Sequence, residues 1–137
     1  MIKNIVKDDK FLSQVSVDAT IEDKYIIQDL KDTLMANKSR CVGMASNMIG
    51  ELKNIIVILI DDKPFIMVNP KILNIFGLPY VTKEGCLCRS KQIETKRFEK
   101  IKVEYLDEDF KKRIKTFEGF VAQIIQHEID HTLGIIV

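Results

Sequence analysis

The stretch Gln126-His127-Glu128-Ile129-Asp130-His131, close to the end of the sequence, contains both histidines of the chain and has the pattern H-E-x-x-H. On an α-helix, residues i and i+4 lie on one face, so His127 and His131 can bind one metal ion together. Glu128 then lies beside that ion, where a carboxylate can move a proton to or from a bound water. The stretch therefore predicts a metal-binding helix, and other parts of the chain must complete its site.

Composition predicts one globular domain spanning residues 1–137. Apolar residues make up 46% of the chain and charged residues 30%, which is typical of a folded domain with a single core. The 21 basic and 20 acidic residues leave a net charge of +1. A nucleic-acid-binding face needs a basic excess, so the charge balance gives no nucleic-acid signal.

The sequence shows neither a membrane-spanning stretch nor an export signal. The longest apolar run, Ile55 to Ile60, is far shorter than the ~20 residues that cross a bilayer. The first ten residues are too highly charged for a signal peptide. We therefore expect a cytoplasmic protein, in which the three cysteines are reduced thiols or metal ligands and not a disulfide framework.

The hydrophobic pattern predicts an α+β fold, in which mostly antiparallel β-sheets pack around the C-terminal metal-binding helix, with one N-terminal helix. Residues 1–20 are expected to be extended, and residues 41–50 show neither helical nor strand periodicity. Asn69-Pro70 is expected to end a strand. The helices are expected at residues 21–37 and 118–133, and the strands at 54–60, 65–68, 101–106 and 112–117.

A catalytic metal needs about three protein ligands and an open position, so the two histidines require a partner. The six residues after His131 offer no suitable side chain, and the third ligand must lie upstream. Cysteine thiolate is the strongest candidate, from Cys41, Cys86 or Cys88. Cys86 is favoured because it follows Gly85 in a loop, where the backbone can approach an ion. The other two could be buried small hydrophobic residues, the usual role of a free cysteine.

Three segments in order make the pattern more specific: Gly43-Met-Ala-Ser-Asn-Met-Ile-Gly50, Glu84-Gly-Cys-Leu-Cys88 and Gln126-His-Glu-Ile-Asp-His131. Together they resemble the three signature motifs of the peptide deformylases. The third segment matches its motif fully, the second in four of five positions, and the first only in part. Because the spacing also fits, the resemblance covers nearly the whole chain.

The resemblance implies a metal ion held by Cys86, His127 and His131, with Fe(II) as the usual metal and zinc as an alternative. It implies hydrolysis of the N-formyl group from the initiator methionine of nascent polypeptides. In that reaction a metal-bound hydroxide attacks the formyl carbon. Glu128 acts as general base and then as general acid. The Leu87 backbone N–H helps to stabilise the developing oxyanion.

The resemblance also implies how the formylmethionyl peptide binds. The backbone of Val42 and Gly43 would pair with the peptide as an added strand. Phe120 and Ile124 would line the pocket for the methionine side chain. The implied partners are therefore N-formylmethionyl nascent peptides, met at the ribosome by a monomeric enzyme.

Glu84 and Arg97 occupy positions where the family has supporting residues. Their side chains could form an ion pair that braces the cysteine loop, or an ordinary surface pair that contributes little to stability.

Met48 is the main departure from the family, which has a glutamine at this substrate-contacting position. A thioether cannot donate the hydrogen bond that a glutamine amide gives to the substrate oxygen. This departure suggests an alternative, a weak or inactive deformylase-like protein that binds metal and formyl peptides. An H-E-x-x-H endopeptidase is a third possibility, which is disfavoured because no third ligand follows His131.

Overall fold

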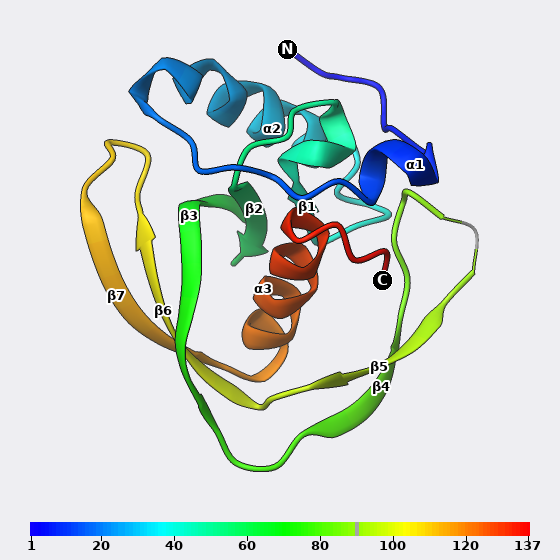
Figure 1. Ribbon diagram of the computed structural model, residues 1–137, viewed down its shortest axis with the longest axis vertical. Coiled ribbons are helices and arrows are strands. Elements are labelled where there is room, and N and C mark those ends of the chain that lie inside the picture. The colour runs from blue at the N-terminus through cyan, green and yellow to red at the C-terminus, as the bar shows by residue number, and fades with distance from the viewer. Residues whose placement is uncertain (90) are drawn as a thin grey trace.

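The computed structural model describes residues 1–89 and 91–137. Figure 1 shows a central helix, α3, partly surrounded by strands, with the N-terminal segments above it. The helical elements are α1 (Asp9–Leu12), η1 (Ile21–Asp23), α2 (Lys24–Ala36), η2 (Ser46–Ile49) and α3 (Gly119–Thr132). The strands are β1 (Gly43–Ala45), β2 (Ile55–Ile60), β3 (Lys63–Phe76), β4 (Tyr80–Glu84), β5 (Ile93–Arg97), β6 (Lys100–Leu106) and β7 (Lys112–Glu118).

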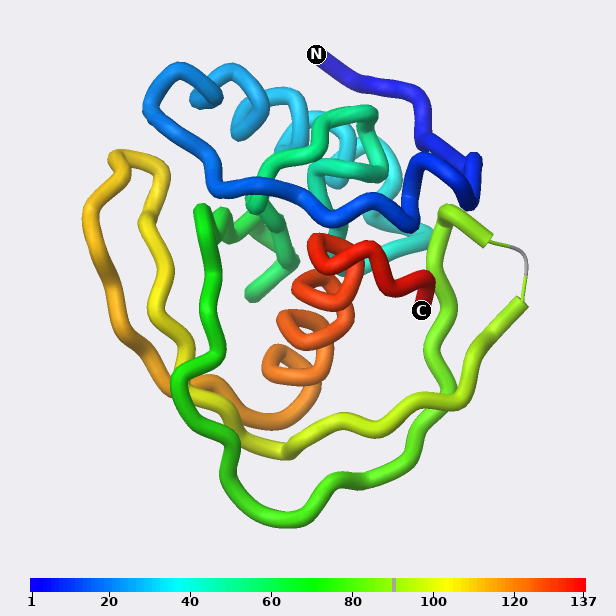
Figure 2. The backbone as a smooth tube through the Cα atoms, in the orientation of Figure 1, coloured from blue at the N-terminus to red at the C-terminus, as the bar shows by residue number. Residues whose placement is uncertain are grey.

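The strands form two sheets in which every pair of neighbours is antiparallel. Five strands have the order β1-β2-β3-β6-β7, and β4 pairs with β5 in a separate two-stranded sheet. The tube in Figure 2 shows β4 and β5 leaving the larger sheet and reaching the opposite side of α3. The predicted α+β class is confirmed.

Strand β2 is buried on both faces of the larger sheet over most of its length, which explains its uninterrupted apolar sequence. Successive side chains of a strand point to opposite faces. Ile55 and Val57 accordingly belong to the core cluster beneath α2, whereas Ile56 and Ile58 belong to the cluster beneath α3. The core is therefore continuous through the sheet, and α3 has a rigid support.

The two predicted helices form where the sequence places them. A capping box at Thr20 and Asp23 begins the first helical segment, because each side chain reaches the other residue's backbone N–H. Gly134, whose φ is 78°, follows α3 in the left-handed conformation that ends many helices. The start of the N-terminal helical segment and the end of α3 thus follow from local capping chemistry.

The predicted break at Asn69-Pro70 is wrong, because β3 runs through it to Phe76. The chain absorbs the proline in a register irregularity between Val68 and Lys71. Asn69 takes φ 50° there, and its side chain exchanges hydrogen bonds with the Ala19 backbone. A bulge interrupts the hydrogen-bond ladder at this position, so proline, which has no N–H, can occupy it without losing a hydrogen bond between the strands.

Several short elements are too short to show a hydrophobic period in the sequence. These are α1 in the expected extended lead-in, β1 in the segment without periodicity, and the pair β4–β5 around the second motif. No helix within residues 1–89 and 91–137 is both long enough and apolar enough to span a membrane.

Candidate metal centre

Helix α3 brings the two histidines together inside the protein. His127 is 7% exposed and His131 is fully buried. Their Nε2 atoms lie 3.1 Å apart, as expected for side chains one helical turn apart that point to one place. Two imidazole nitrogens at this distance can bind one ion.

Cys86 provides a sulfur atom at the same place. Its Sγ lies 3.4 Å from Nε2 of His131. A tetrahedral zinc ion would hold two imidazole nitrogens about 3.3 Å apart, and a thiolate sulfur about 3.6 Å from each nitrogen. The nitrogen–nitrogen distance and the sulfur distance to His131 are close to these values, so the three side chains could hold one metal ion and leave a fourth position for water.

Cys88, which the sequence left open as a ligand or a buried small side chain, also lies at the site. The ligand atoms of Cys86, Cys88 and His131 all lie within 4.8 Å of one another. Adding Cys88 to the two histidines and Cys86 would give a closed set of four ligands, which is typical of structural zinc sites. An open hydrolytic site would therefore use one of the two cysteines, and Cys86 is the one that lines the cavity.

A buried carboxylate orients His127. Nδ1 of His127 lies 2.8 Å from Oε1 of Glu84, an arrangement in which the ring donates its Nδ1–H and leaves Nε2 for a metal. Arg97 donates to the same carboxylate at 2.7 Å and to Asp130 at 2.7 Å. The pair of Glu84 and Arg97 is thus buried and braces the cysteine loop against α3.

The electrostatics of Glu84 match this arrangement. Burial alone would raise the pKa of this carboxyl group. Hydrogen bonds from His127 and Arg97 outweigh burial and lower the pKa of Glu84 to about 2. The carboxylate therefore stays ionised and available to His127.

Sequence reasoning missed the further support of this carboxylate. Gln123 donates its Nε2 to Oε2 of Glu84 at 3.0 Å, and the Tyr80 hydroxyl donates to Gln123 Oε1 at 3.1 Å. The only signal in the sequence was that Gln123 precedes His127 by one helical turn. Asn47 was also missed, and its amide donates to the backbone carbonyl of His131 at 2.9 Å.

Glu128 is buried beside the histidines, with 4% of its surface exposed. Burial is the main reason why its pKa is raised to about 7. Its Oε1 is buried and finds no hydrogen-bond partner in the described part of the chain. A carboxyl group of this kind can accept and release a proton near neutral pH.

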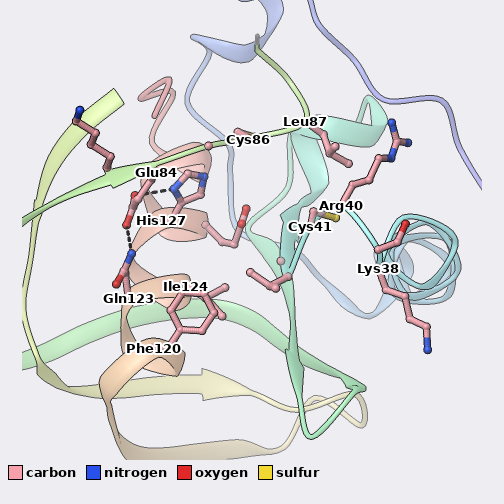
Figure 3. A pocket seen from close by; sticks show the side chains of 16 residues that line it. Lys38, Arg40, Cys41, Glu84, Cys86, Leu87, Phe120, Gln123, Ile124 and His127 are labelled. Carbon is pink, nitrogen blue, oxygen red and sulfur yellow. Dashed lines mark hydrogen bonds and ion pairs between the residues drawn. The ribbon is translucent and has the colours of Figure 1, made fainter. Parts of the chain in front are cut away.

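A cavity of about 560 Å³ opens next to this cluster, between the segment before β1 and the loop after β4 (Figure 3). Phe120 and Ile124 of α3 lie on one side of it, below Gln123 and His127. The cavity is lined by Lys38, Ser39, Arg40, Cys41, Val42, Gly43, Lys83, Glu84, Gly85, Cys86, Leu87, Phe120, Gln123, Ile124, His127 and Glu128.

Two residues of the predicted site are not part of the lining of this cavity, His131, which is buried behind it, and Met48. Met48 is the predicted substrate-binding residue of the two. Its side chain is 1% exposed and belongs to the core cluster beneath α2. It follows β1 in the short helical turn η2, which turns the chain into the core. Its predicted contact with the substrate remains a prediction.

An α+β fold that places two imidazoles, a thiol and a buried glutamate beside an open cavity defines a metal-dependent hydrolase. The family model for polypeptide deformylase matches residues 2–137. The chain is 51% identical to the peptide deformylase of Clostridium beijerinckii, with all of both sequences covered. It is 37% identical to that of Thermoanaerobacter pseudethanolicus, covering 81% of this chain and 69% of the relative. The chain belongs to the peptide deformylase family.

Solved structures agree with this assignment. The peptide deformylase of Thermotoga maritima superposes with a TM-score of 0.89 at 28% identity, covering 99% of this chain and 95% of that one. The class I type b enzyme of Acinetobacter baumannii bound to Met-Ala-Ser gives 0.88 at 25% identity, covering 99% and 97%. The chain is a metallohydrolase that deformylates nascent peptides. The alternative of a weak or inactive relative is not supported.

Proposed function

We propose that Cys86, His127 and His131 hold the metal ion of this deformylase, and that Glu128 carries the proton in the reaction. The observation that supports this most strongly is the convergence of one sulfur and two nitrogens. His131 Nε2 lies 3.4 Å from Cys86 Sγ and 3.1 Å from His127 Nε2. Glu128 lines the same cavity and has a buried oxygen without a protein partner.

The proposed reaction removes the N-formyl group from the initiator methionine. A metal ion at this site supplies Lewis acidity, which lowers the pKa of water and polarises a carbonyl group. Glu128 takes a proton from the attacking water and then donates it to the leaving amine. The Leu87 backbone N–H, in the cavity wall, donates to the formyl oxygen as negative charge develops there.

We assign Fe(II) as the native metal, with zinc as the alternative. Imidazole nitrogen suits both metals, and thiolate sulfur is a soft ligand that binds both. The donor set of Cys86, His127 and His131 is compatible with either ion. Metal analysis of protein purified without oxygen from cells grown in balanced metals will distinguish them.

The peptide would bind along the free edge of β1. This strand is at the end of the five-stranded sheet, so one of its edges has no neighbouring strand within that sheet. Val42 and Gly43 line the cavity at this edge, where an extended peptide can add as a further strand. Phe120 and Ile124 supply apolar surface for the methionine side chain.

The proposal extends to the whole protein, as one domain over residues 1–137 that works as a monomer in the cytoplasm. Formylated chains emerge from the ribosome, so the enzyme would meet them there. Size-exclusion chromatography with light scattering checks the monomer. Co-sedimentation with ribosomes carrying a short formylated nascent chain checks the encounter.

The test is release of formate from a formyl-Met-Ala-Ser peptide by iron-loaded protein, prepared and assayed without oxygen. We expect turnover by the wild-type protein and about one equivalent of bound metal. We expect Cys86→Ser to lose both metal and turnover. A Cys86→Ser variant that keeps a full metal complement would contradict the ligand assignment.

A further inference from the structure

Two of the three cysteines form a close pair, and one of them, Cys88, has no part in the proposed hydrolysis. The thiol of Cys88 donates to Sγ of Cys86 with a sulfur–sulfur distance of 3.0 Å. The residues lie in a turn in which the Arg89 N–H donates to the Cys86 carbonyl oxygen at 3.3 Å. Both sulfur atoms therefore lie on the same side of the turn, with the Cys88 N–H 3.5 Å from Cys86 Sγ.

The two thiols differ in their access to small molecules. Cys86 lines the cavity and is partly exposed, whereas Cys88 is 2% exposed. An oxidant that enters the cavity therefore meets Cys86 first, and Cys88 is the thiol immediately behind it. This is the arrangement of an attacking cysteine with a resolving partner.

The third cysteine offers a comparison within the same cavity. Cys41 also lines the cavity, but it belongs to the segment before β1 and not to the cysteine loop (Figure 3). A disulfide requires sulfur atoms about 2.05 Å apart. From 3.0 Å, Cys86 and Cys88 need only a small movement of a loop that connects two strands.

We propose that Cys86 and Cys88 are a modification site at which a hydroperoxide forms a reversible intramolecular disulfide. The Cys86 sulfur attacks a peroxide oxygen, the O–O bond breaks, and Cys86 becomes a sulfenic acid as water or an alcohol leaves. The Cys88 sulfur then attacks the sulfenic sulfur. The S–O bond breaks, the S–S bond forms, and the leaving hydroxide takes the Cys88 proton as water. Two thiols and one hydrogen peroxide thus give one disulfide and two waters.

The modification has two consequences. It removes the Cys86 thiolate from the metal site, so the metal ion is released. This consequence rests on the proposed ligand role of Cys86, whereas the disulfide itself does not. The disulfide also protects Cys86 from further oxidation to a sulfinic acid. Thiols can reduce the disulfide, whereas they cannot reduce the sulfinic acid.

The experiment treats the full-length, zinc-loaded protein with a few equivalents of hydrogen peroxide, followed by intact mass spectrometry, peptide mapping and a zinc-binding dye. Zinc is used because it does not itself change oxidation state. We expect the wild type to lose two hydrogen atoms, to link Cys86 to Cys88, and to release one equivalent of zinc. Reduction with dithiothreitol and added zinc should restore both the mass and the metal.

Matched variants make the result decisive. Cys88→Ser and Cys88→Ala should gain oxygen atoms on Cys86 and fail to recover zinc binding after reduction. Two substitutions are used so that a folding defect in one of them does not decide the result. Cys41→Ser should form the same disulfide as the wild type. Oxygen addition without a link in the wild type, or a link through Cys41, overturns the proposal. A Cys86–Cys88 disulfide with zinc retained supports the modification site and contradicts the ligand role of Cys86.

Discussion

At the scale of single residues, the site depends on how closely β1 approaches α3. A Cβ atom placed on Gly43 would lie 2.7 Å from Ile124 Cγ2 and 2.9 Å from Glu128 Oε2. Only glycine allows the strand to lie this close to the proposed proton carrier. The same closeness puts Gly43 at the cavity wall, where the peptide backbone is proposed to bind.

Gly43→Ala should therefore destabilise the protein by about 1–3 kcal/mol, because the added methyl group overpacks a rigid contact. Urea denaturation followed by circular dichroism measures the change. Gly85→Ala is the matched control, since its Cβ would find Gln92 Cγ at an ordinary 3.7 Å. Equal free energies of unfolding for the two variants would show that Ile124 and Glu128 move aside without cost, which would contradict the prediction.

Single residues also show what the sequence could and could not reveal. The contact of His127 with His131 follows from helical periodicity alone. The loop position after Gly85 favoured Cys86 as their partner but left Cys41 and Cys88 open, and the resemblance then implied Cys86. The Cys88 sulfur at 3.0 Å from Cys86 was not foreseen, because a turn geometry decides it and spacing does not.

At the scale of elements, Glu84 at the end of β4 connects the small sheet to the metal-binding helix. It accepts hydrogen bonds from Arg97 of β5 and from Gln123 of α3, and it pairs with His127. Sequence analysis could not choose between this brace and a surface pair. It had missed both β4 and β5, and only their pairing buries the two side chains.

Glu84→Gln should lower metal affinity by about 10–100-fold, the usual effect of losing an outer partner of a metal-binding histidine. Competition with a fluorescent zinc chelator measures the affinity. Glu94→Gln, an exposed change on the neighbouring strand β5, serves as the control. An unchanged affinity in Glu84→Gln would remove this carboxylate from the account of the site.

The hairpin of β6 and β7 gives a prediction about pH. The Asp107 carboxylate accepts hydrogen bonds from the backbone N–H groups of Lys111 and Asp109 and from the Arg113 side chain. The Lys111 contact contributes most to lowering the pKa of Asp107 below 3.8. A carboxyl group with a lowered pKa in the folded state stabilises the fold above its unfolded pKa. That contribution is lost as pH falls through the folded value.

We therefore expect the free energy of unfolding to fall between about pH 5 and about pH 3, and Asp107→Asn to make that fall shallower. Urea denaturation at a series of pH values measures it. Asp109→Asn, an exposed change in the same turn, is the control. Identical pH profiles for wild type and Asp107→Asn would contradict the role given to this turn.

At the scale of the whole molecule, the fold brings the two halves of the proposed site into contact beside one cavity. The C-terminal helix supplies two imidazoles, and the loop after β4 supplies the thiol. Composition and periodicity predicted the fold class and the two main helices. They could not predict how β3 continues past Pro70, because that depends on a tertiary contact between Asn69 and Ala19.

Because the proposed ligands come from segments far apart in the sequence, metal binding should stabilise the whole fold. A ligand present at one hundred times its dissociation constant adds about 2.7 kcal/mol. We expect removal of the metal with a chelator to lower the melting temperature, and re-addition to restore it, by differential scanning calorimetry. Cys86→Ser should have the same melting temperature with and without metal. If metal raised the melting temperature of this variant as much as that of the wild type, the proposed ligands would be contradicted.

The most direct test of the central claim is the rate of formate release by Glu128→Gln, measured beside its metal content. The account predicts that the variant binds a full equivalent of metal and loses about 10²–10⁴ in rate, because the proton carrier is gone and the ligands remain. Glu118→Gln, exposed at the start of the same helix, should match the wild type in both respects. A metal-loaded Glu128→Gln protein that releases formate at the wild-type rate would contradict the claim.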